Sequence, residues 1–416
     1  MAYEMKDILS HLSRRGLFLI GTNEDKLGPL GILLMRNLYQ EWRKSISIIR
    51  GKACNVLEIQ PTTLDKGLND NIKSLSDSSN SLLHFWNLDR DGLTSRQNSI
   101  KMMNPALPFV LIRQINSVSG GESFKAFLRF YCSPKESQLW YHTWKKERAT
   151  WWRKLSINRP GRFVLEEDSF DDSKTYDRAR IVLSYNNYKE TVEDISYCKD
   201  SNEIEKNICN SNNFHSITCS SYMTQGVLAY LIDSYHCRQL MHANGASKDG
   251  FKSLKLHPRL SPIKAAIIHP NTDRIHFVEL AEYLAKKLNS AEIVTWIESA
   301  KCLEECYKNH DEMGTLFCIV IDDNTVKYGD VKLRHRDTGL LEQIHLMDVK
   351  LCIERDLQNS YEDNLPPDLQ RRLFLFYDEK NEMNVKICCS PVHAMIRSMP
   401  AVACVATYLF IVLQAK

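Results

Sequence analysis

A run of six apolar residues, Leu316–Ile321, places the strongest constraint on how this chain folds. Near-continuous apolar strands belong to sheets that are covered on both faces, because a strand with one solvated face alternates apolar and polar residues. The segment is therefore predicted to be a strand of a sheet that lies between two layers of other elements.

Regular elements are predicted before and after this strand. In order they are a strand 263–268, a helix 272–288 capped by Thr272, a strand 293–297, a helix 299–308, the strand 316–321, a hairpin of 331–334 and 341–346, and a closing helix with Val349, Ile353 and Leu357. The order β-α-β-α-β-β-α is typical of an α/β domain with a mixed sheet.

A second strong pattern lies in Thr224–Tyr235. Apolar residues recur there at the spacing of one face of a helix, and they are Val227, Leu228, Leu231 and Ile232. The spacing predicts a buried helix. Spacing alone allows two interpretations, the wall of an active site or a helix that only packs against a sheet, and the choice depends on Gln225.

The length of 416 residues predicts two or three domains. A polar linker at 242–252 marks a boundary, so we expect a first domain at 1–250, a second at 251–358 and a C-terminal extension at 359–416. The first domain contains a polar insertion at about 61–104, rich in Asn, Ser and Asp. Apolar runs at 109–112 and 127–131 on either side of Ser119-Gly120-Gly121 predict a β-hairpin.

Sequence motifs for catalysis are missing from the chain. It has no phosphate-binding glycine loop, no HExxH motif and no GxSxG motif. Its 13 cysteines form no CxxC pair, so free thiols in a reducing compartment are expected. We therefore predict no catalytic residue, no cofactor and no metal site.

A basic, tryptophan-rich helix is predicted at 137–155. The formal net charge of the whole chain is only +3, so an argument for nucleic acid has to rest on a local patch such as this one. Basic residues interleaved with aromatics can bind nucleic acid through phosphate contacts and stacking. The alternative is a helix with its tryptophans in the core and its basic residues in solvent. The candidate DNA contacts are Lys145, Lys146, Arg148, Arg153 and Lys154.

The two ends of the chain carry no clear targeting signal. The N-terminus contains Glu4 and Asp7, which fits neither a secretory signal nor a transit peptide. The apolar run Ala401–Leu413 is shorter than the roughly 20 residues that cross a bilayer. We expect a docked C-terminal segment and no membrane association, with a tail anchor as the alternative.

Several segments together resemble a known family. Arg14-Arg15-Gly16, Gly28-Pro29-Leu30-Gly31 with Trp42, the helix at 225–235 and Leu256–Lys264 follow the order found in class II glycyl-tRNA synthetases. Residues 307–314 and 333–338 resemble their anticodon-binding domain. The chain is more similar to the synthetase-derived accessory subunits of mitochondrial DNA polymerase gamma, on Trp151–Lys154, Leu228–Leu231 and Leu254–Pro258. This resemblance implies a class II synthetase-like antiparallel sheet domain followed by an anticodon-binding-like α/β domain with a mixed sheet.

Departures from the synthetases favour a protein without catalysis. The turn that corresponds to the second synthetase motif reads Val118-Ser119-Gly120-Gly121, with no Arg-x-Glu. Gln225 stands where the third motif has an arginine over the adenine, and a neutral amide does not replace that cation. We expect Gln225 to mark a degenerate ATP site, which favours the packing interpretation of its helix.

The resemblance also implies a function and partners. It implies a processivity subunit in the mitochondrial matrix nucleoid that binds the catalytic subunit of mitochondrial DNA polymerase and primer-template DNA. The insertion is short and polar, so we expect a monomer that binds the polymerase one to one. Charge and position make Lys332, Arg334 and Arg336 candidate partner contacts. The alternative is a glycyl-tRNA synthetase-like protein, active or degenerate, that binds tRNA.

Overall fold

Two β-sheets organise the part of the chain described by the computed structural model. The described residues are 5–19, 26–46, 48–49, 52–53, 55–64, 107–117, 123–157, 162–167, 176–199, 214–238, 241–242, 245–246, 251–271 and 274–362. Residues through Ser360 belong to one compact unit, and both sheets lie within it. The insertion after residue 64, the turn 118–122 and the apolar run 401–413 lie outside the described residues.

The first sheet has seven described strands, in the order β5-β6-β7-β11-β10-β9-β8. Only β5 and β6 pair in parallel, and the other neighbours are antiparallel. The predicted hairpin is confirmed as β6–β7, in register from Phe109↔Tyr131 to Ser117↔Ser123. The strands are β5 (Asn55–Leu64), β6 (Phe109–Ser117), β7 (Ser123–Cys132), β8 (Phe163–Glu167), β9 (Tyr176–Tyr185), β10 (Tyr188–Cys198) and β11 (His215–Tyr222).

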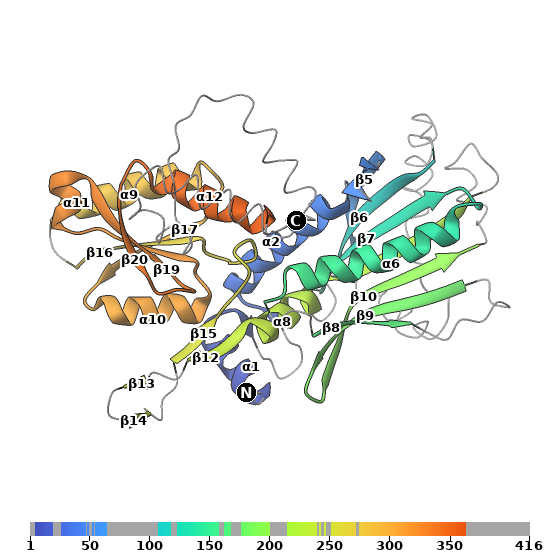
Figure 1. The fold of residues 1–416 in the computed structure, drawn as a ribbon, viewed down its shortest axis with the longest axis horizontal. Coiled ribbons are helices and arrows are strands. Elements are labelled where there is room, and N and C mark those ends of the chain that lie inside the picture. The colour runs from blue at the N-terminus through green and yellow to red at the C-terminus, as the bar shows by residue number, and fades with distance from the viewer. Residues whose placement is uncertain are drawn as a thin grey trace, which may run out of the picture. The chain divides into compact units, whose positions relative to one another are not determined.

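Three helices contribute to the core on one side of this sheet, which we call the helix side. They are α2 (Pro29–Ile46), α6 (Ser137–Lys154) and α8 (Met223–Ser234), and Figure 1 shows α6 and α8 beside the strands. Helix α8 contacts β7, β10, β11 and α2, whereas α6 contacts β8 and β11. The predicted helix at 224–235 is confirmed as α8, and its Val227, Leu231 and Ile232 are buried in the core. The apolar face of α8 therefore packs against the sheet, as the interpretation of a packing helix predicted.

Short two-stranded ribbons and a further helix complete the first part of the chain. The helix is α1 (Met5–Arg14). The ribbons are β1 (Phe18–Leu19) with β2 (Lys26–Leu27), β3 (Ile48–Ile49) with β4 (Lys52–Ala53), β12 (Tyr235–Arg238) with β15 (Phe251–Leu254), and β13 (Met241–His242) with β14 (Gly245–Ala246).

The second sheet confirms the predicted mixed α/β domain. Its described strands follow the order β17-β16-β18-β19-β20, with β16 parallel to both neighbours and the last pairs antiparallel. They are β16 (Ala265–Pro270), β17 (Thr295–Ala300), β18 (Phe317–Val320), β19 (Asp330–His335) and β20 (Leu341–His345), and the helices are α9 (Ile275–Asn289), α10 (Leu303–Met313), α11 (Asp323–Tyr328) and α12 (Val349–Glu362).

Strand β18, which lies within the apolar run, is buried along its whole length because helices lie on both faces of the sheet. Residues of α9 and α12 join the core on one face, and Cys306 and Tyr307 of α10 join a smaller cluster on the other. The predicted helix at 299–308 is displaced to 303–313. Strand β17 continues to Ala300, and the helix ends at Gly314, whose φ of 79° is the left-handed conformation that glycine adopts readily.

Charged residues connect the first core to the second sheet. Arg259 donates to Glu41 of α2 at 2.8 Å, and both side chains are buried. Lys264 is also buried and donates to the carbonyl oxygens of Pro258 and Arg259. The first core includes residues up to Leu260, and the second begins at Ala265. The predicted domain boundary at 250 stays a prediction, and the change from the first core to the second takes place between Leu260 and Ala265.

Helix α1 makes a second connection, to α10. Arg14 and Arg15 both donate to the Glu312 carboxylate, and the His11 ring donates from Nε2 to the Glu312 carbonyl oxygen at 3.1 Å. Burial lowers the pKa of His11 to about 4, although the Glu312 carbonyl opposes the shift. The His11 ring is therefore neutral at physiological pH and serves as a fixed donor.

Within the described residues, no helix is both long enough and apolar enough to cross a membrane. The same part of the chain contains no group of three or more His, Cys, Asp or Glu side chains that is arranged to hold a metal ion.

Gly226 sets the distance between α8 and its neighbours, and its replacement should lower stability. A Cβ atom at this position would lie 2.7 Å from Cη2 of Trp152 and 3.2 Å from Cδ2 of Leu38. Gly226→Ala should therefore destabilise the protein by about 1–3 kcal/mol, the usual cost of overpacking a core. Urea denaturation measures the change, with Gln225→Ala as the control for helix propensity. Equal stability of wild type and Gly226→Ala would contradict this packing.

Candidate functional site

Two of the five predicted DNA contacts lie inside the protein. The Lys145 ammonium is 2.9 Å from the Glu167 carboxylate on β8, and the residue is 5% exposed. Arg148 is 2% exposed and donates from Nε to both carboxylate oxygens of Glu193, at 2.9 and 3.1 Å. Neither side chain offers its charge to a phosphate at the surface, so the prediction of DNA contact is not carried further for these two.

The Arg148–Glu193 pair is the centre of a buried polar network. Trp152 donates from its indole nitrogen to Glu193, and Arg148 donates from Nη1 to the Ser45 hydroxyl of α2 at 2.9 Å. The guanidinium also lies over the Trp151 ring, 4.4 Å from its centroid. The structure thus confirms the interpretation in which the tryptophans of this helix lie in the core.

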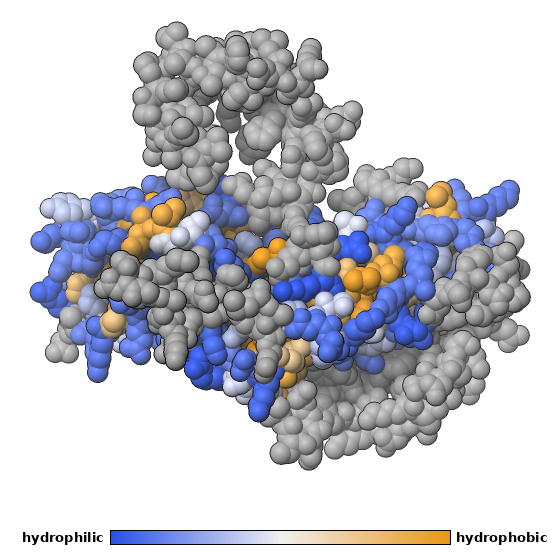
Figure 2. Space-filling model, turned by 60° about the horizontal axis from the view of Figure 1, so that its bottom comes forward, coloured by the Kyte–Doolittle hydropathy of each residue, from blue (hydrophilic) through white to orange (hydrophobic). Residues whose placement is uncertain are grey.

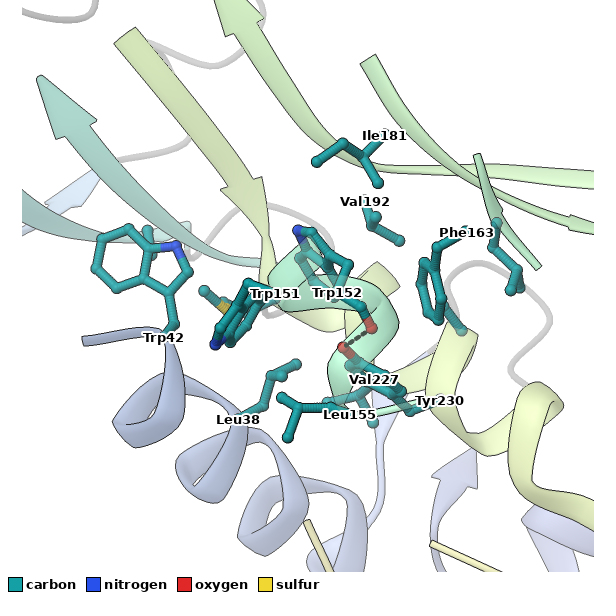
Figure 3. Close-up of a cluster of buried hydrophobic side chains, with 14 of the residues drawn as sticks. Leu38, Trp42, Trp151, Trp152, Leu155, Phe163, Ile181, Val192, Val227 and Tyr230 are labelled. Carbon is teal, nitrogen blue, oxygen red and sulfur yellow. Dashed lines mark hydrogen bonds between the residues drawn. The ribbon is translucent and has the colours of Figure 1, made fainter. Parts of the chain in front are cut away.

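Figure 3 shows the aromatic and aliphatic side chains of the core around α6. Trp42 projects from α2, and Trp151 and Trp152 project from α6. The Trp152 ring stacks on Tyr230 of α8, whose hydroxyl donates to the Trp152 carbonyl oxygen at 2.9 Å. A β-bulge at Val192 lets both Val192 and Glu193 reach the helix side of the sheet. Helices α2, α6 and α8 are therefore held against β10 by one set of contacts.

The remaining predicted DNA contacts lie nearer to the surface. Lys146 is exposed, whereas Arg153 and Lys154 are half-buried. Arg153 donates from Nε to the carbonyl oxygen of Phe163 at 2.9 Å. Contact of these three residues with DNA stays a prediction.

The three predicted partner contacts also differ in how far their side chains are exposed. Lys332 is exposed at the surface of β19 and pairs with Asp322 at 2.8 Å. Arg334 donates to both carboxylate oxygens of Asp311, each at 2.8 Å. Arg336 is buried and donates to the carbonyl oxygens of Leu256 and Gly314. Two of the three therefore hold the protein together, and only Lys332 presents its side chain outward.

Gln225 lies in the first turn of α8. Its Oε1 atom is buried and has no hydrogen-bond partner among the described residues. The adjacent Thr224 accepts a hydrogen bond from the backbone nitrogen of Phe124 at 3.2 Å, which joins the start of α8 to β7. Gln225 thus lies in a helix that packs against the sheet, and its side chain is a neutral amide that carries no positive charge.

The opposite face of the first sheet carries a set of charges that the sequence analysis did not find. We call it the polar sheet face. Strand register places its residues on one side, because antiparallel partners share a face and alternate residues of each strand point the same way. Its basic cluster consists of Arg113 on β6, Lys125 and Arg129 on β7, and Arg178 and Arg180 on β9.

One carboxylate, Asp194 of β10, lies among these cations. It accepts a hydrogen bond from the Tyr222 hydroxyl at 2.7 Å and forms ion pairs with Arg178 at 3.0 Å and Arg180 at 3.9 Å. The Lys125 ammonium lies over the Tyr222 ring, 5.1 Å from its centroid. Burial lowers the pKa of Lys125, and the Asp194 charge opposes that shift.

Hydroxyl groups occupy the space between the charged strands. Ser216, Thr218 and Ser220 alternate along β11 with core residues, and Ser196 pairs with Thr218 across the sheet. All four are buried. At the far edge of this face, Lys189 and Glu166 pair with each other at 2.8 Å. The polar sheet face thus combines cations and hydroxyl donors, which is the chemistry that binds anions.

Sequence reasoning missed this cluster because its members come from strands that span residues 113–194. A weak signal was available in two places. Lys125 and Arg129 are an even number of positions apart and flanked by core residues in β7, and Arg178 and Arg180 alternate with core residues in β9. Such alternation predicts one polar face, but only the pairing of the strands shows that these residues share it.

Comparison with known proteins gives two kinds of match. Residues 264–355 match the family model of the anticodon binding domain, which covers the second sheet and its helices. The chain is 24% identical over 404 residues to DNA polymerase subunit gamma-2, mitochondrial, of Xenopus laevis, covering 83% of this chain and 86% of the relative. It is 26% identical over 424 residues to DNA polymerase subunit gamma-2 of Bos taurus, covering 83% and 84%.

The chain resembles the accessory subunits of mitochondrial DNA polymerase gamma. Its likeness to synthetases is shorter, with 26% identity to the glycine–tRNA ligase of Thermus thermophilus over 257 residues, covering 53% of this chain and 50% of the relative. Together with the two sheets, these matches confirm the predicted fold, a synthetase-like antiparallel sheet domain followed by an anticodon-binding-like α/β domain.

The buried ion pair leads to a prediction about stability. Arg148→Met should leave the Glu193 carboxylate buried beside no cation and destabilise the protein by about 3–5 kcal/mol. Glu193→Met should be similarly harmful. The double variant should be much closer to wild type, because two apolar side chains of similar volume replace two desolvated charges. A double-mutant cycle measured by urea denaturation tests this, and additive losses would contradict a paired role.

Proposed function

We propose that this chain is a non-catalytic accessory subunit of mitochondrial DNA polymerase. The observation that carries the proposal is its similarity, over 83% of its length, to proteins named DNA polymerase subunit gamma-2. In this role the protein binds the catalytic subunit and primer-template DNA in the mitochondrial matrix nucleoid. It lowers the rate at which the polymerase leaves DNA and does not accelerate nucleotide addition.

The lack of catalysis is proposed from the residues at the former ATP site. Enzymes that act on phosphates accelerate the reaction mainly by stabilising the charge of the reacting polyphosphate. Gln225 supplies an amide at the position where the synthetase motif supplies a cation, and α8 packs its apolar residues into the core. ATP–pyrophosphate exchange with glycine separates this proposal from the alternative of an active glycyl-tRNA synthetase, and we expect no exchange.

Docking of the polymerase on the second sheet and its helices is supported by exposed apolar surface. Of 16 exposed large hydrophobic residues in the described part of the chain, 12 lie between Ile275 and Leu351. Figure 2 shows such residues as separate patches on a largely hydrophilic face. Tyr283, Met347 and Leu351 form what we call the C-terminal apolar patch, in which the Tyr283 hydroxyl lies 3.9 Å from the Met347 sulfur. Exposed apolar residues of this kind favour contact with another protein.

The proposed DNA contacts are now Lys146, Arg153 and Lys154 of α6. Two of them, Lys146 and Lys154, are separated by two helical turns, and neighbouring Lys145 and Arg148 are engaged with carboxylates inside the protein. We further propose that the protein is a monomer and binds the polymerase one to one. Native mass spectrometry measures both stoichiometries, and a homodimer mass would reject this part of the proposal.

Addition of the protein to its polymerase should lengthen the products of single binding events. A primer-extension assay with a trap for released polymerase measures product length, and the rate per nucleotide should stay unchanged. Leu351→Asp in the C-terminal apolar patch should weaken the effect. Leu19→Asp on β1 is the control, because this leucine is also exposed, at 45% against 55% for Leu351, and lies outside both proposed contact regions. Product lengths that do not change with the wild-type protein would refute the proposed function.

DNA affinity should depend on Lys146 and Lys154 of α6, which are exposed and half-buried, respectively. Each phosphate contact contributes about 0.9 to the slope of log affinity against log salt concentration. Lys146→Glu combined with Lys154→Glu should weaken binding to primed duplex DNA and reduce this slope by about 2. Lys286→Glu, on an exposed position of α9, should change neither quantity. An unchanged slope in the double variant would exclude α6 as the DNA contact.

A further inference from the structure

We propose that strand β17 accepts an extended segment of a partner protein as an additional strand of the second sheet, and that this segment carries apolar and basic side chains. The catalytic subunit of the polymerase is taken as the partner, so in this one respect the inference rests on the proposed function. Three features of β17 support it. They are the direction of its backbone groups, its exposed apolar side chains and the charges at its two ends.

Strand β17 lies at one edge of the second sheet, and β16 is its one neighbour among the described strands. The carbonyl oxygens of Val294 and Ala300 accept hydrogen bonds from backbone nitrogens at the two ends of β16, at 2.9 and 3.1 Å. Successive residues of a strand direct their N–H and C=O groups to opposite sides. The even-numbered residues therefore face β16, whereas Ile297 and Ser299 direct their backbone groups away from the sheet.

These outward backbone groups are available for another strand. The first outward N–H group, that of Thr295, is already bound, because it donates to Oδ1 of Asn289 at 3.2 Å. The N–H groups of Ile297 and Ser299 have no hydrogen-bond acceptor among the described residues. An edge with unpaired backbone groups is a template on which an extended chain can form main-chain hydrogen bonds.

The side chains of β17 do not protect this edge. Proteins usually place charged residues on exposed edge strands, and β20 at the other edge carries an exposed glutamate and an exposed histidine. In β17 the one charged residue, Glu298, forms an ion pair with His310 of α10 at 3.2 Å. Exposed instead are Trp296 at 50%, Ile297 at 39% and Leu303, the first residue of α10, at 41%. An exposed tryptophan is typical of the residues that contribute most to binding a partner.

The charges at the ends of β17 indicate what kind of segment binds there. Glu292 precedes the strand, and Glu304 and Glu305 follow it. All three are exposed and have no ion pair with a described residue, and Lys301 is the one basic residue within 292–305. A second copy of this chain, paired antiparallel on β17, would bring the two acidic ends together, and like charges on paired strands repel. A segment with lysine or arginine beside its apolar residues is attracted instead.

Hydrogen exchange of single amides tests the proposal on the full wild-type chain, alone and in complex with the catalytic subunit. The Ile297 and Ser299 amides should exchange rapidly in the protein alone and at least about tenfold more slowly in the complex, because hydrogen bonding protects amides from exchange. The amides of Trp296 and Glu298 face β16 and are the internal reference. They should be protected in both samples.

A proline at position 297 removes one outward donor. Ile297→Pro should weaken binding of the catalytic subunit about tenfold, through the loss of a main-chain hydrogen bond and of the side chain that accompanies it. Edge strands tolerate proline where the N–H group faces solvent. Ile297→Thr is the matched control, because it keeps the N–H group and a β-branched side chain, and it should bind more tightly than the proline variant. The melting temperature of each variant reports whether the sheet stays folded.

Charge reversal tests the basic character of the segment. Glu304→Lys should weaken binding of the catalytic subunit several-fold at low salt, and the difference from wild type should shrink as salt is added. Asp7→Lys is the matched control, because Asp7 is also an exposed acidic residue in the first turn of a helix, α1. It should bind as the wild type does.

Three results would overturn the proposal while leaving the proposed function intact. The first is unchanged exchange of Ile297 and Ser299 in a complex that forms and lengthens the products. The second is equal binding by the wild type, Ile297→Pro and Glu304→Lys. The third is protection of the two amides in the protein alone that grows with its concentration, which would identify a second copy as the occupant. By contrast, absence of both complex formation and longer products would refute the proposed function itself, and the partner named here with it.

Discussion

The ion pair between Arg148 and Glu193 is the interaction on which the first domain depends. Both charges are removed from water, so their desolvation is offset only if the geometry is complete. The two Nε–carboxylate contacts, the Trp152 indole and the Ser45 hydroxyl supply most of that geometry, and only Nη2 of Arg148 has no hydrogen-bond partner among the described residues. Trp152 in turn stacks on Tyr230 and limits the space at Gly226. One charged pair thereby fixes the positions of α2, α6 and α8 on the sheet.

Buried charge also joins the first core to the second sheet. Glu41 meets Arg259 next to Lys264, whose pKa burial lowers to about 7 while the Glu41 charge opposes the shift. Arg336 donates to the Leu256 and Gly314 carbonyl oxygens from the end of β19. These charge-assisted hydrogen bonds are directional, so small displacements of the donor or acceptor groups weaken them. Several basic residues of the described chain, among them Arg259, Lys264 and Arg336, are therefore engaged inside the protein.

The sequence predicted those features that a local pattern reports directly. The apolar run 316–321 indicated a strand buried on both faces, and the spacing in 224–235 indicated a packing helix, because periodicity follows burial. The same reasoning failed for Arg148, since its partner Glu193 is 45 residues away and no local signal connects them. It also failed for the polar sheet face, whose residues are brought together only by strand register. The partners of these residues depend on contacts between segments that are far apart in sequence, and a local sequence pattern does not report such contacts.

The two faces of the first sheet differ in the groups that surround their buried charges. On the helix side Lys145 and Arg148 each meet a carboxylate, so their charges are compensated within the fold. On the polar sheet face five cations surround Asp194, and a row of hydroxyls lies between them. The difference between the faces lies in their polar residues, because both also carry buried apolar side chains, Ile217 and Cys219 on the helix side and Phe109, Leu111 and Tyr131 on the polar sheet face.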